Sequence, residues 1–376
     1  MTNEPTHEQL VAAMDAQPPT PRIVGAAPIV LYGAGGKGRE TLALLRQQAR
    51  EVVAFLDSTS KGECDGIPIL PPNDPAVKKL AHNGCTAVVT VFNPLVDPLP
   101  LHEMLQKLGF ARTLGMVEAR ELGIARDAYW LTDSAAMAPP RAEAEWLYDT
   151  LADDQSRRTL IESIALRRTG DVRLLRSPSL SDQYCPVGIA LPRKGLRMVD
   201  GGAFDGDTIV NMLASGIEFE ALAAFEPDPI NYAALIERTR KAVPTIAASL
   251  WPCGLDATTR QMRFNARGLA SSGMSDRGEL VIQTVAFDEA LSNWRPNYVK
   301  LDIEGAEALA LRGMADTLQR VRPAVAVCIY HKPADLWELP RLIDNLLPDS
   351  NLYIRSHAWN GFDLVLYAVP REMQAT

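Results

Sequence analysis

The chain has 376 residues, of which 47% are hydrophobic and 22% are charged, so it is typical of a folded protein and longer than one hydrophobic core usually organises. We therefore expect two domains joined by a connecting segment. The formal net charge of -8 argues against a protein that binds a nucleic-acid backbone, so no nucleic-acid partner is expected.

The spacing of the cysteines and the length of the apolar runs indicate in which cellular compartment the protein is expected. Five cysteines are scattered singly along the chain, with no C-x-x-C pair, so neither a disulfide framework nor a zinc knuckle is indicated. The N-terminal residues lack the apolar core of a signal peptide, and no apolar run approaches the ~20 residues needed to span a bilayer. We expect a cytoplasmic protein with no membrane partner.

The N-terminal part of the chain alternates strand-like and helical patterns. The first 25 residues are polar and proline-rich, and we expect them to form a flexible tail with one short helix at most. Strands are predicted at 28–32, 52–56 and 86–91, with helical sequence between them. This alternation is typical of a parallel sheet covered by helices, and it predicts a Rossmann-like domain of the nucleotide-binding type over 26–135.

A glycine cluster follows the first of these strands. It matches G-x-G-x-x-G and contains Gly33, Gly35, Gly36 and Gly38. Asp57 stands at the end of the next strand, where it suits a ribose diol, and the helix N-terminus suits a phosphate. Together with Gly66-Ile-Pro-Ile69, the segment resembles the small Rossmann domains attached to sugar-modifying transferases. Such domains bind a nucleotide or serve only as a scaffold, and both alternatives stay open here.

The remainder of the chain falls into a helical segment and a second α/β region. Apolar residues recur at helical spacing between 136 and 180, which predicts a helical linker. Strand-like runs then return at 196–199, 222–225, 298–301, 324–330, 352–355 and 364–368. The sequence therefore predicts a second doubly wound domain over 181–376.

The second domain opens with a strand that ends in Asp200 and continues as D-x-G-x-x-x-G to Gly206. Glycines are needed where the backbone turns tightly and approaches a ligand. About twenty residues further on, Glu226 ends the next strand, as the acceptor of a ribose diol would. The loop lacks a third packing glycine, and Asp205 and Asp207 would repel a diphosphate. A cationic, phosphate-free nucleoside such as S-adenosylmethionine fits this loop better.

Several segments of this half resemble the FkbM family of methyltransferases, from about residue 153 to the C-terminus. The segments are Arg167–Asp171, Asp182–Pro186, Val199–Thr208, Phe225–Asp228, Val299–Glu307, Ile329–Pro333 and Val365–Ala368, with Cys185 as a departure where the family often has an aromatic residue. The resemblance implies a class I methyltransferase fold, with a seven-stranded, mostly parallel sheet that has one antiparallel edge strand. It also implies methyl transfer to oxygen, commonly on a hydroxyl of a saccharide or polyketide.

The same resemblance implies the donor site. The methionine part would be surrounded by Asp200, Gly201, Gly202, Ala203, Phe204, Asp205 and Gly206; the ribose by Glu226 and Pro227; the adenine edge by Gly254 and Leu255; and the methyl group by Asp302, Glu304 and Gly305. Ligands of open α/β sheets bind beyond the carboxyl ends of the strands, so these positions agree with the predicted strand ends.

An alcohol acceptor needs its proton removed as the methyl group transfers. His331, which follows a long apolar run, is the first candidate for this base, ahead of His357 and Asp302. A hydrogen-bonded structural histidine is the alternative interpretation of His331.

Other polar and aromatic residues have two possible roles. Tyr184, His357 and Trp359 are candidate walls of an acceptor pocket, or else core residues. No metal-ligand spacing is evident and no metal is expected, although Asp302 with Glu304 leaves a magnesium site open. No motif identifies the acceptor or the oligomeric state.

Two further functions stay open at this point. In one, the chain is an NAD-dependent oxidoreductase or a nucleotide-sugar-modifying enzyme that uses the N-terminal glycine loop. In the other, it is a catalytically silent binding protein. Against the oxidoreductase, the C-terminal half carries a complete nucleoside-binding pattern of its own.

Overall fold

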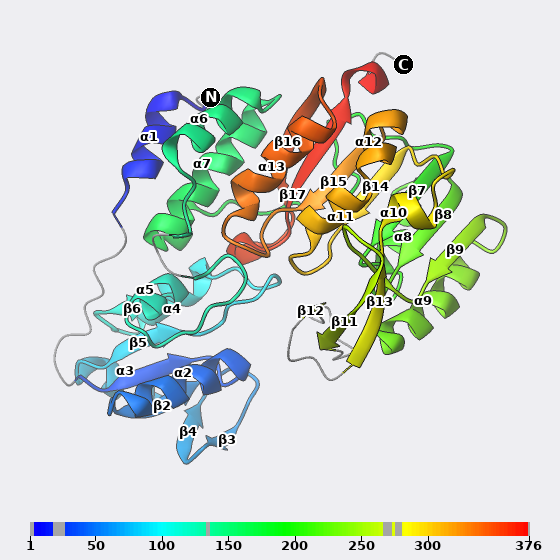
Figure 1. Ribbon diagram of the computed structural model, residues 1–376. Helices are drawn as coiled ribbons and strands as arrows, with labels where there is room; N and C mark the ends of the chain where they lie inside the picture. The colour runs from blue at the N-terminus through cyan, green and yellow to red at the C-terminus, as the bar shows by residue number, and fades with distance from the viewer. Residues whose placement is uncertain (1–3, 18–26, 133–135, 266–272, 275–279, 375–376) are drawn as a thin grey trace. The chain divides into compact units, whose positions relative to one another are not determined.

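The computed structural model describes residues 4–17, 27–132, 136–265, 273–274 and 280–374. The chain folds as two compact units (Figure 1). Unit 1 contains Met1–Glu145, Arg158–Pro178 and Ala358–Asp363, and unit 2 contains Trp146–Arg157, Ser179–His357 and Leu364–Thr376. The predicted linker at 136–180 is thus shared between the two units, because helical periodicity shows that a segment is amphipathic without showing which core buries it.

Unit 1 is built around a sheet of six strands in the described residues, in the order β3-β4-β2-β1-β5-β6. Its strands are β1 (Ile29–Tyr32), β2 (Val52–Leu56), β3 (Gly62–Cys64), β4 (Ile67–Leu70), β5 (Thr86–Val89) and β6 (Thr113–Leu114). Its helices include α1 (His7–Asp15), α2 (Gly36–Gln47), α3 (Pro75–His82), α4 (Leu99–Lys107) and α5 (Met116–Glu121), with the 3-10 turns η2 (Val172–Leu174) and η3 (Trp359–Gly361). Only the β3–β4 pair is antiparallel among these strands.

Strand β1 is buried on both faces, as a central parallel strand should be. Val30 and Tyr32 point to one face, where they pack with Val77 of α3 and Leu105 of α4. No residue of α2 belongs to that cluster. Because β-α-β crossovers are right-handed, α2 lies on the opposite face of the sheet. The predicted Rossmann-like arrangement is therefore present in unit 1.

The predicted N-terminal tail contains a well-formed helix, α1. Thr6 and Gln9 form a capping box, in which the Thr6 hydroxyl accepts the Gln9 amide and the Gln9 side chain accepts the Thr6 amide. Leu10 is fully buried, and Asp15 forms a 2.6 Å ion pair with Arg141. The one short helix that the sequence allowed within the tail is therefore present at His7–Asp15, with the T-x-x-Q helix signal at its start.

Two long helices, α6 (Arg141–Thr150) and α7 (Asp154–Thr169), follow in the chain, and each is divided between the two units. Within unit 2, Ser156 of α7 donates its hydroxyl to Asp153, which also receives the Arg355 guanidinium at 2.6 Å. The Ser156 hydroxyl also accepts the Ile354 amide. These buried polar contacts attach the start of α7 to the sheet of unit 2.

Unit 2 is built around a sheet of seven strands among the described residues, in the order β16-β17-β15-β14-β7-β8-β9. These strands are β7 (Leu196–Gly201), β8 (Phe219–Phe225), β9 (Ala247–Trp251), β14 (Tyr298–Leu301), β15 (Ala324–Cys328), β16 (Ser350–Ser356) and β17 (Leu364–Pro370). The mostly parallel sheet expected of a class I methyltransferase is confirmed. The antiparallel strand, however, is β17, which pairs with both β15 and β16 and so is not an edge strand.

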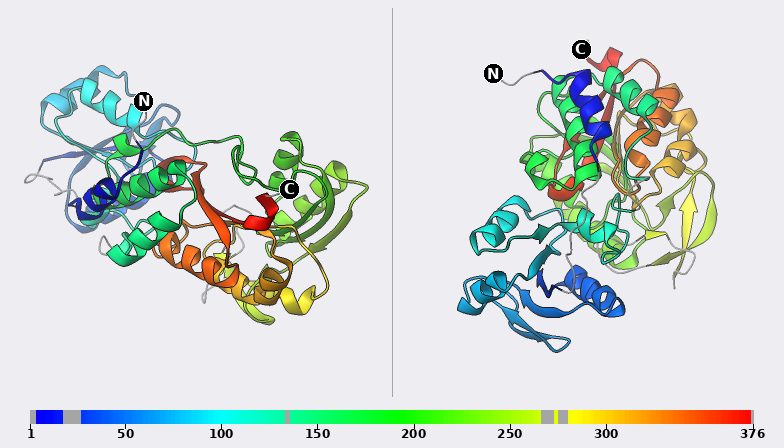
Figure 2. Two further views of the ribbon diagram at one scale, coloured as in Figure 1. Left: turned by 90° about the horizontal axis from the view of Figure 1, so that it is seen from above. Right: turned by 90° about the vertical axis from the view of Figure 1, so that its left-hand side faces the viewer.

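Helices cover both faces of this sheet. They are α8 (Asp207–Ala214), α9 (Pro229–Ala242), α10 (Phe287–Ala290), α11 (Glu307–Gly313), α12 (Ala315–Val321) and α13 (Asp335–Leu346), with the C-terminal turn η4 (Arg371–Gln374). Figures 1 and 2 show α8 and α9 on one face and α11 to α13 on the other. Strands β14 and β15 are accordingly buried at every position.

A second, smaller sheet in unit 2 has no counterpart in the sequence prediction. It contains β10 (Gly254–Leu255), β11 (Arg260–Asn265), β12 (Gly273–Met274) and β13 (Leu280–Val285). The pair β10–β13 is parallel and the pair β11–β13 is antiparallel. Strands β10 and β12 have two residues each, and Arg260 and Arg263 interrupt the apolar residues of β11, so the apolar signal of these three strands in the sequence is weak.

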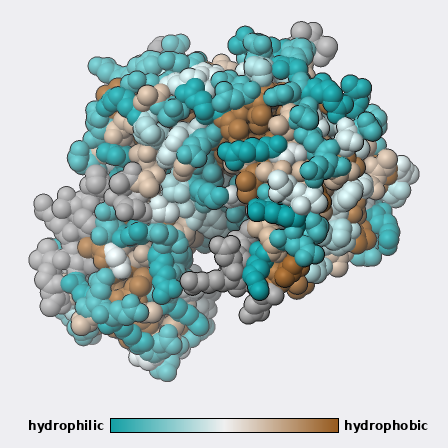
Figure 3. Space-filling view, viewed as in Figure 1, coloured by the Kyte–Doolittle hydropathy of each residue, from teal (hydrophilic) through white to brown (hydrophobic). Residues whose placement is uncertain are grey.

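The surface drawn in Figure 3 is mostly hydrophilic, and apolar side chains appear there only in small separate groups. The long apolar runs are instead buried in the two main sheets. Across the described residues, no helix combines the length and the hydropathy required to cross a membrane.

Candidate functional site

The sheet of unit 2 has its switch point at β7, because β8 and β9 continue on one side of it and β14 and β15 on the other. The carboxyl ends of β7 and β14 are joined there by a hydrogen bond from the Asp302 amide to the Gly201 carbonyl, at 3.1 Å. The predicted donor loop and the predicted strand-end loop therefore meet at one place in the fold.

The donor loop requires glycine at its centre. Gly202 has a φ of +72°, and a Cβ at this position would lie 1.9 Å from the Asp302 carbonyl oxygen. Gly206, the N-cap of α8, has a φ of +84°. Both positions adopt a backbone that L side chains rarely adopt. The two predicted glycines thus allow the loop to turn directly against the end of β14.

A buried lysine supports the same loop. Lys300 of β14 lies with its Nζ 3.0 Å from the Asp200 carboxylate, and it donates to the carbonyl oxygens of Gly201 and Gly202 at 3.3 and 2.6 Å. Burial alone would lower the pKa of Lys300, but the Asp200 and Asp302 carboxylates outweigh burial and raise it. Lys300 was not among the predicted site residues. The sequence feature that could have identified it is a lysine inside an otherwise apolar strand, since lysine is almost never fully buried unless it is paired.

Glu226 connects the end of β8 to the donor loop. Its carboxylate accepts the Phe204 amide at Oε2 and the Asp228 amide at Oε1, both at 2.9 Å. Burial raises the pKa of this carboxyl, which is 5% exposed. A carboxylate has about four acceptor positions, so each oxygen keeps one for a further donor. Two such positions fit the two hydroxyls of a ribose, and the site therefore fits S-adenosylmethionine.

The other predicted donor-site residues surround this loop. A Cβ at Gly254 would lie 4.0 Å from Cγ of Pro227, and Leu255 Cδ1 would lie 3.0 Å from a Cβ at Gly201. The residues predicted for the adenine edge thus reach the loop from the small second sheet. Asp205 is paired with Arg238 of α9, which neutralises part of the loop's negative charge.

His331 lies just beyond β15 in a cluster of carboxylates. Its Nδ1 is 2.9 Å from Glu307 Oε1, and its Nε2 is 3.4 Å from Asp302 Oδ1 and 4.0 Å from Glu304 Oε1. Burial alone would lower the pKa of His331, but these carboxylates outweigh it and raise the pKa to about 10. A protonated imidazole cannot accept a proton, so this geometry disfavours the base role expected for His331. Glu307, which completes the cluster, was not predicted.

The predicted pocket residues separate into two groups. The Tyr184 hydroxyl donates to Asp302 Oδ2 at 2.8 Å, and the Tyr184 amide donates to the Tyr367 hydroxyl at 3.0 Å. That hydroxyl shares a 2.8 Å hydrogen bond with His357 Nε2. Tyr184 and His357 are thus connected to the strand-end loop. Trp359 belongs to unit 1 instead, where its amide donates to a carbonyl of that unit.

The glycines of the N-terminal loop have different roles. A Cβ at Gly38 would lie 1.9 Å from the Gly33 carbonyl oxygen, so Gly38 permits close packing of α2 on β1. At Gly35 and Gly36, in contrast, no atom of the residues that the structure describes would lie within 4 Å of a Cβ. Gly35 is the N-cap of α2 and supplies no side-chain hydrogen bond. The first turn of α2 is therefore open on this side.

Asp57 organises the loop beside these glycines. Its Oδ2 accepts the Ala34 amide, and its Oδ1 accepts the amides of Thr59 and Ser60 and the Thr59 hydroxyl. Burial would raise the pKa of Asp57, but the backbone donors outweigh it and lower the pKa to about 2. With four donors already bound, this carboxylate has less capacity for a ribose diol than Glu226 has.

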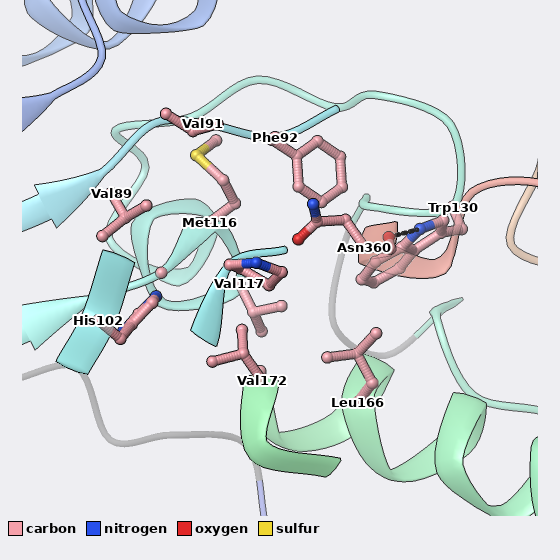
Figure 4. Close-up of a pocket in the computed structure, with 13 residues that line it drawn as sticks. Val89, Val91, Phe92, His102, Met116, Val117, Trp130, Leu166, Val172 and Asn360 are labelled. Carbon is pink, nitrogen blue, oxygen red and sulfur yellow. Dashed lines mark hydrogen bonds between the residues drawn. The ribbon is translucent and has the colours of Figure 1, made fainter. Parts of the chain in front are cut away.

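A pocket lies in unit 1 at the carboxyl end of β5 (Figure 4). Its walls are mainly apolar and aromatic, and include Val91, Phe92 and Trp130; the polar groups are His102 and Asn360. Burial lowers the pKa of His102. The pocket adjoins the glycine loop, because a Cβ at Gly33 would lie 3.0 Å from Cγ2 of Val91.

Comparison with known families supports this division of the chain. Residues 200–355 match the methyltransferase FkbM domain, which covers the donor loop and the strand-end loop. Residues 28–96 match the PglD N-terminal domain, which covers the glycine loop and Asp57.

Similar proteins agree with these matches. The hexuronic acid methyltransferase AglP of Haloferax volcanii is 30% identical over 135 residues, which are 34% of this chain and 53% of that protein, so the match spans about half of its length. A solved structure of methyltransferase FkbM from Methylobacillus flagellatus aligns with a TM-score of 0.80 over 96% of this chain and 98% of that one, at 22% identity, and so shows the shared fold. Residues 200–355 therefore form an FkbM methyltransferase domain, and the chain carries an additional N-terminal Rossmann-like domain.

Proposed function

We propose that this protein transfers the methyl group of S-adenosylmethionine to a hydroxyl oxygen of a saccharide-like or polyketide-like small molecule. The observation that carries the proposal is the Glu226 carboxylate, which is oriented by two backbone amides at the edge of the donor loop and keeps one acceptor position on each oxygen. The FkbM domain match over the same residues supports it.

The chain's own residues hold and align the reactants. Glu226 would bind the ribose hydroxyls, and the loop from Asp200 to Gly206, fixed by Lys300, would enclose the methionine part. The bound donor supplies an activated methyl group on its sulfonium. Since this transfer is an in-line displacement, the protein must chiefly align the acceptor oxygen and exclude water.

The acceptor would approach the methyl group beside Asp302. The Asp302 side chain is 26% exposed, whereas the His331 side chain is 2% exposed. The Tyr184 hydroxyl donates to Oδ2 of Asp302, and Oδ1, which lies 3.4 Å from His331 Nε2, is the oxygen that would receive the acceptor's proton. We therefore assign this step to Asp302 in place of His331. The choice of a sugar-like acceptor is supported by the name of the AglP relative, a hexuronic acid methyltransferase.

The experiment pairs donor binding with methyl transfer. Isothermal titration of the full chain with S-adenosylmethionine should show one site. Transfer of labelled methyl from the donor should then be measured on a panel of saccharides, uronic acids and polyketide alcohols, with matched deoxy compounds as controls. Absence of donor binding would refute the proposal. Donor binding with transfer only to amines or carboxylates would refute the hydroxyl assignment.

The pocket in unit 1 suggests that the protein binds a second ligand. We propose that a nucleotide binds there, with its base against Phe92 and Trp130 and its phosphate at the open first turn of α2. The match to the PglD N-terminal domain lies over the same loop. Titration with uridine, adenosine and nicotinamide nucleotides tests this, and the pocket variant Phe92→Ala should abolish any binding observed. If none of these nucleotides binds, unit 1 is a scaffold only.

A further inference from the structure

One buried tyrosine contacts both the lysine that supports the donor loop and the carboxylate at the strand-end loop. Tyr184, in the segment before β7, donates its hydroxyl to Asp302 Oδ2 at 2.8 Å, and the centre of its ring lies 5.4 Å from Lys300 Nζ. From this geometry we propose that Tyr184 is a positioning residue of methyl transfer, which fixes the orientation and the ionised state of the Asp302 carboxylate. The inference rests on the proposed function, in which Asp302 accepts the proton of the acceptor.

The Tyr184 hydroxyl determines which Asp302 oxygen stays available for that proton. A hydrogen bond of 2.8 Å to Oδ2 restricts rotation of the carboxylate and leaves Oδ1 on the side of His331 Nε2, at 3.4 Å. As the acceptor oxygen bonds to the methyl carbon, its O–H bond breaks, the proton passes to Oδ1, and the electron pair of the S–C bond stays on sulfur. A carboxylate that could rotate would present Oδ1 to the acceptor in fewer molecules, so the transfer would be slower.

The backbone of Tyr184 is held in place by two other tyrosines. Its φ is +67°, a left-handed conformation that a bulky side chain rarely adopts. The Tyr298 hydroxyl donates to the Tyr184 carbonyl oxygen at 2.5 Å, and the Tyr184 amide donates to the Tyr367 hydroxyl at 3.0 Å. Such a conformation persists only where the surrounding structure fixes it. Here β14 and β17, the strands on either side of β15, provide the two hydroxyls.

His357 in turn orients the hydroxyl of Tyr367. His357 Nδ1 is 2.8 Å from the Ser179 carbonyl oxygen, which can only accept, so Nδ1 carries the ring proton. Burial lowers the pKa of His357 and so favours the neutral ring, in which Nε2 is an acceptor. The Tyr367 hydroxyl therefore donates to Nε2 at 2.8 Å, and its oxygen is free to accept the Tyr184 amide.

The ionised state of Asp302 is maintained from three sides. Burial would raise the pKa of this carboxyl, but the charges of Lys300 and His331 and the hydrogen bond from Tyr184 outweigh burial and lower the pKa. The Tyr184 hydroxyl also lies 3.5 Å from Cys328 Sγ. Removal of that hydroxyl alone should raise the pKa of Asp302, because a donor stabilises the carboxylate more than the carboxylic acid.

The first measurement examines Asp302 without donor or acceptor. In the full chain, NMR of the aspartate carboxyl carbons is followed against pH, and the Asp302 resonance is assigned by its absence from Asp302→Asn. Tyr184→Phe keeps the ring and removes only the hydroxyl. We expect the Asp302 resonance of this variant to leave its ionised position at a pH about 0.5–1 unit higher than in the wild type.

The second measurement is methyl transfer to the best acceptor of the panel. Tyr184→Phe should lower kcat by ~10-fold or more and leave the titrated affinity for S-adenosylmethionine unchanged. The acid limb of kcat should move to higher pH, because the transfer requires ionised Asp302 and the variant loses that charge at a higher pH. If Tyr184 were only a pocket wall, the ring of phenylalanine would be sufficient and kcat would be retained.

Two further variants separate this role from a general effect on packing. Tyr232→Phe is the matched control, because the Tyr232 hydroxyl donates to a backbone carbonyl, that of Leu250, at 3.0 Å; it should change neither measurement. Tyr298→Phe loosens Tyr184 without removing its hydroxyl and should shift the Asp302 resonance in the same direction by less. Added to Tyr184→Phe, it should lower kcat no further, since it acts through Tyr184.

Circular dichroism verifies that each variant is folded, and Tyr298→Phe takes over the test if Tyr184→Phe is not. An unchanged Asp302 resonance, a kcat near that of the wild type, a loss of donor affinity, or an equal effect of Tyr232→Phe would each overturn the inference. A wild-type chain that transfers no methyl group refutes the proposed function itself. A wild-type chain that transfers it, with Tyr184→Phe equally active, refutes only the role of Tyr184.

Discussion

Glu226 holds the donor loop through the backbone of Phe204, whose amide donates to Glu226 Oε2 at 2.9 Å across 22 positions of the chain. Replacement of Glu226 by alanine therefore removes both a ligand contact and an anchor of the loop. We expect Glu226→Ala to weaken S-adenosylmethionine binding by ~1.5–3 kcal/mol, as measured by isothermal titration.

The control for this change is the corresponding acid of unit 1. Asp57→Asn removes a carboxylate that also follows the second strand of a Rossmann-like sheet, but it should leave the affinity for S-adenosylmethionine unaltered. Equal losses in the two variants would show a general effect on folding. An unchanged affinity in folded Glu226→Ala would remove Glu226 from the donor site.

Gly202 and Gly216 allow the steric role of the donor loop to be separated from backbone strain. Both have a positive φ, of +72° and +79°, but of the two only Gly202 has a neighbour within 4 Å of an added Cβ, the Asp302 carbonyl oxygen at 1.9 Å. We expect Gly202→Ala to lower the free energy of unfolding by about 3 kcal/mol or more, and Gly216→Ala by about 1 kcal/mol. Urea denaturation gives both values. Similar costs would show that the loop can move away from Asp302.

The positions of the two glycine loops and of their acidic partners were predictable because they follow from local sequence patterns. The two glycine loops and the acids that follow them, Asp57 and Glu226, have a fixed spacing that the β-α-β unit imposes. The sequence also predicted that Asp302 and the donor loop would meet, since carboxyl ends of parallel strands share one edge of the sheet. Asp57 and Glu226 occupy equivalent sequence positions, but the sequence does not show that Asp57 already accepts four hydrogen bonds and Glu226 only two.

What the sequence did not predict depends on contacts between distant segments. Lys300 has a clear reason to be buried only when Asp200 is known to lie beside it. The high pKa of His331 arises from Glu307 and Asp302, which reach it from two other elements. The assignment of Ala358–Asp363 to unit 1 likewise follows from tertiary packing. Because the chain passes between the units repeatedly, point variants test each site more cleanly than truncation does.

Gly36 and Gly38 make a second matched pair, in the first turn of α2. A Cβ at Gly38 would meet the Gly33 carbonyl oxygen at 1.9 Å, whereas a Cβ at Gly36 would have no neighbour within 4 Å. We expect Gly38→Ala to destabilise the protein by more than about 2 kcal/mol. Gly36→Ala should be neutral, or stabilising by up to about 0.5 kcal/mol, because alanine favours the helix. Denaturation midpoints compare the two; a destabilised Gly36→Ala would contradict the open first turn.

Asp57 should stabilise unit 1 in a pH-dependent way. Its pKa falls from 3.8 to about 2 on folding, so the ionised carboxylate favours the folded state above pH 3.8. That contribution is lost as the pH falls through about 2, because the folded state then also binds the proton. We expect Asp57→Asn to cost about 1–2 kcal/mol at pH 7 and less at pH 3. Hydrogen exchange of the Ala34 and Thr59 amides provides the measurement, and a pH-independent cost would contradict the assignment.

The Asp200–Lys300 pair should be strongly coupled because both side chains are buried. Lys300→Met would leave the Asp200 carboxylate buried without its cation, at a cost of about 3–5 kcal/mol. Asp200→Asn would leave the ammonium group in a similar position, although the carbonyl oxygens of Gly201 and Gly202 still accept its hydrogen bonds. The double variant should lose less stability than the sum of the single variants, since no lone charge then stays buried.

A double-mutant cycle measures this coupling, and strand β7 supplies its control. Arg197 of β7 is paired with Glu220 of β8 at the same 3.0 Å, but the two side chains are 33% and 58% exposed, against 0% and 3% for Asp200 and Lys300. We expect a coupling of about 2 kcal/mol or more for the buried pair and below about 1 kcal/mol for the exposed pair, whose attraction is screened by water. Raising the salt concentration should reduce only the Arg197–Glu220 coupling, because a buried pair is screened much less. Equal couplings would mean that solvent reaches Asp200, and that Lys300 does not fix the donor loop through a buried charge.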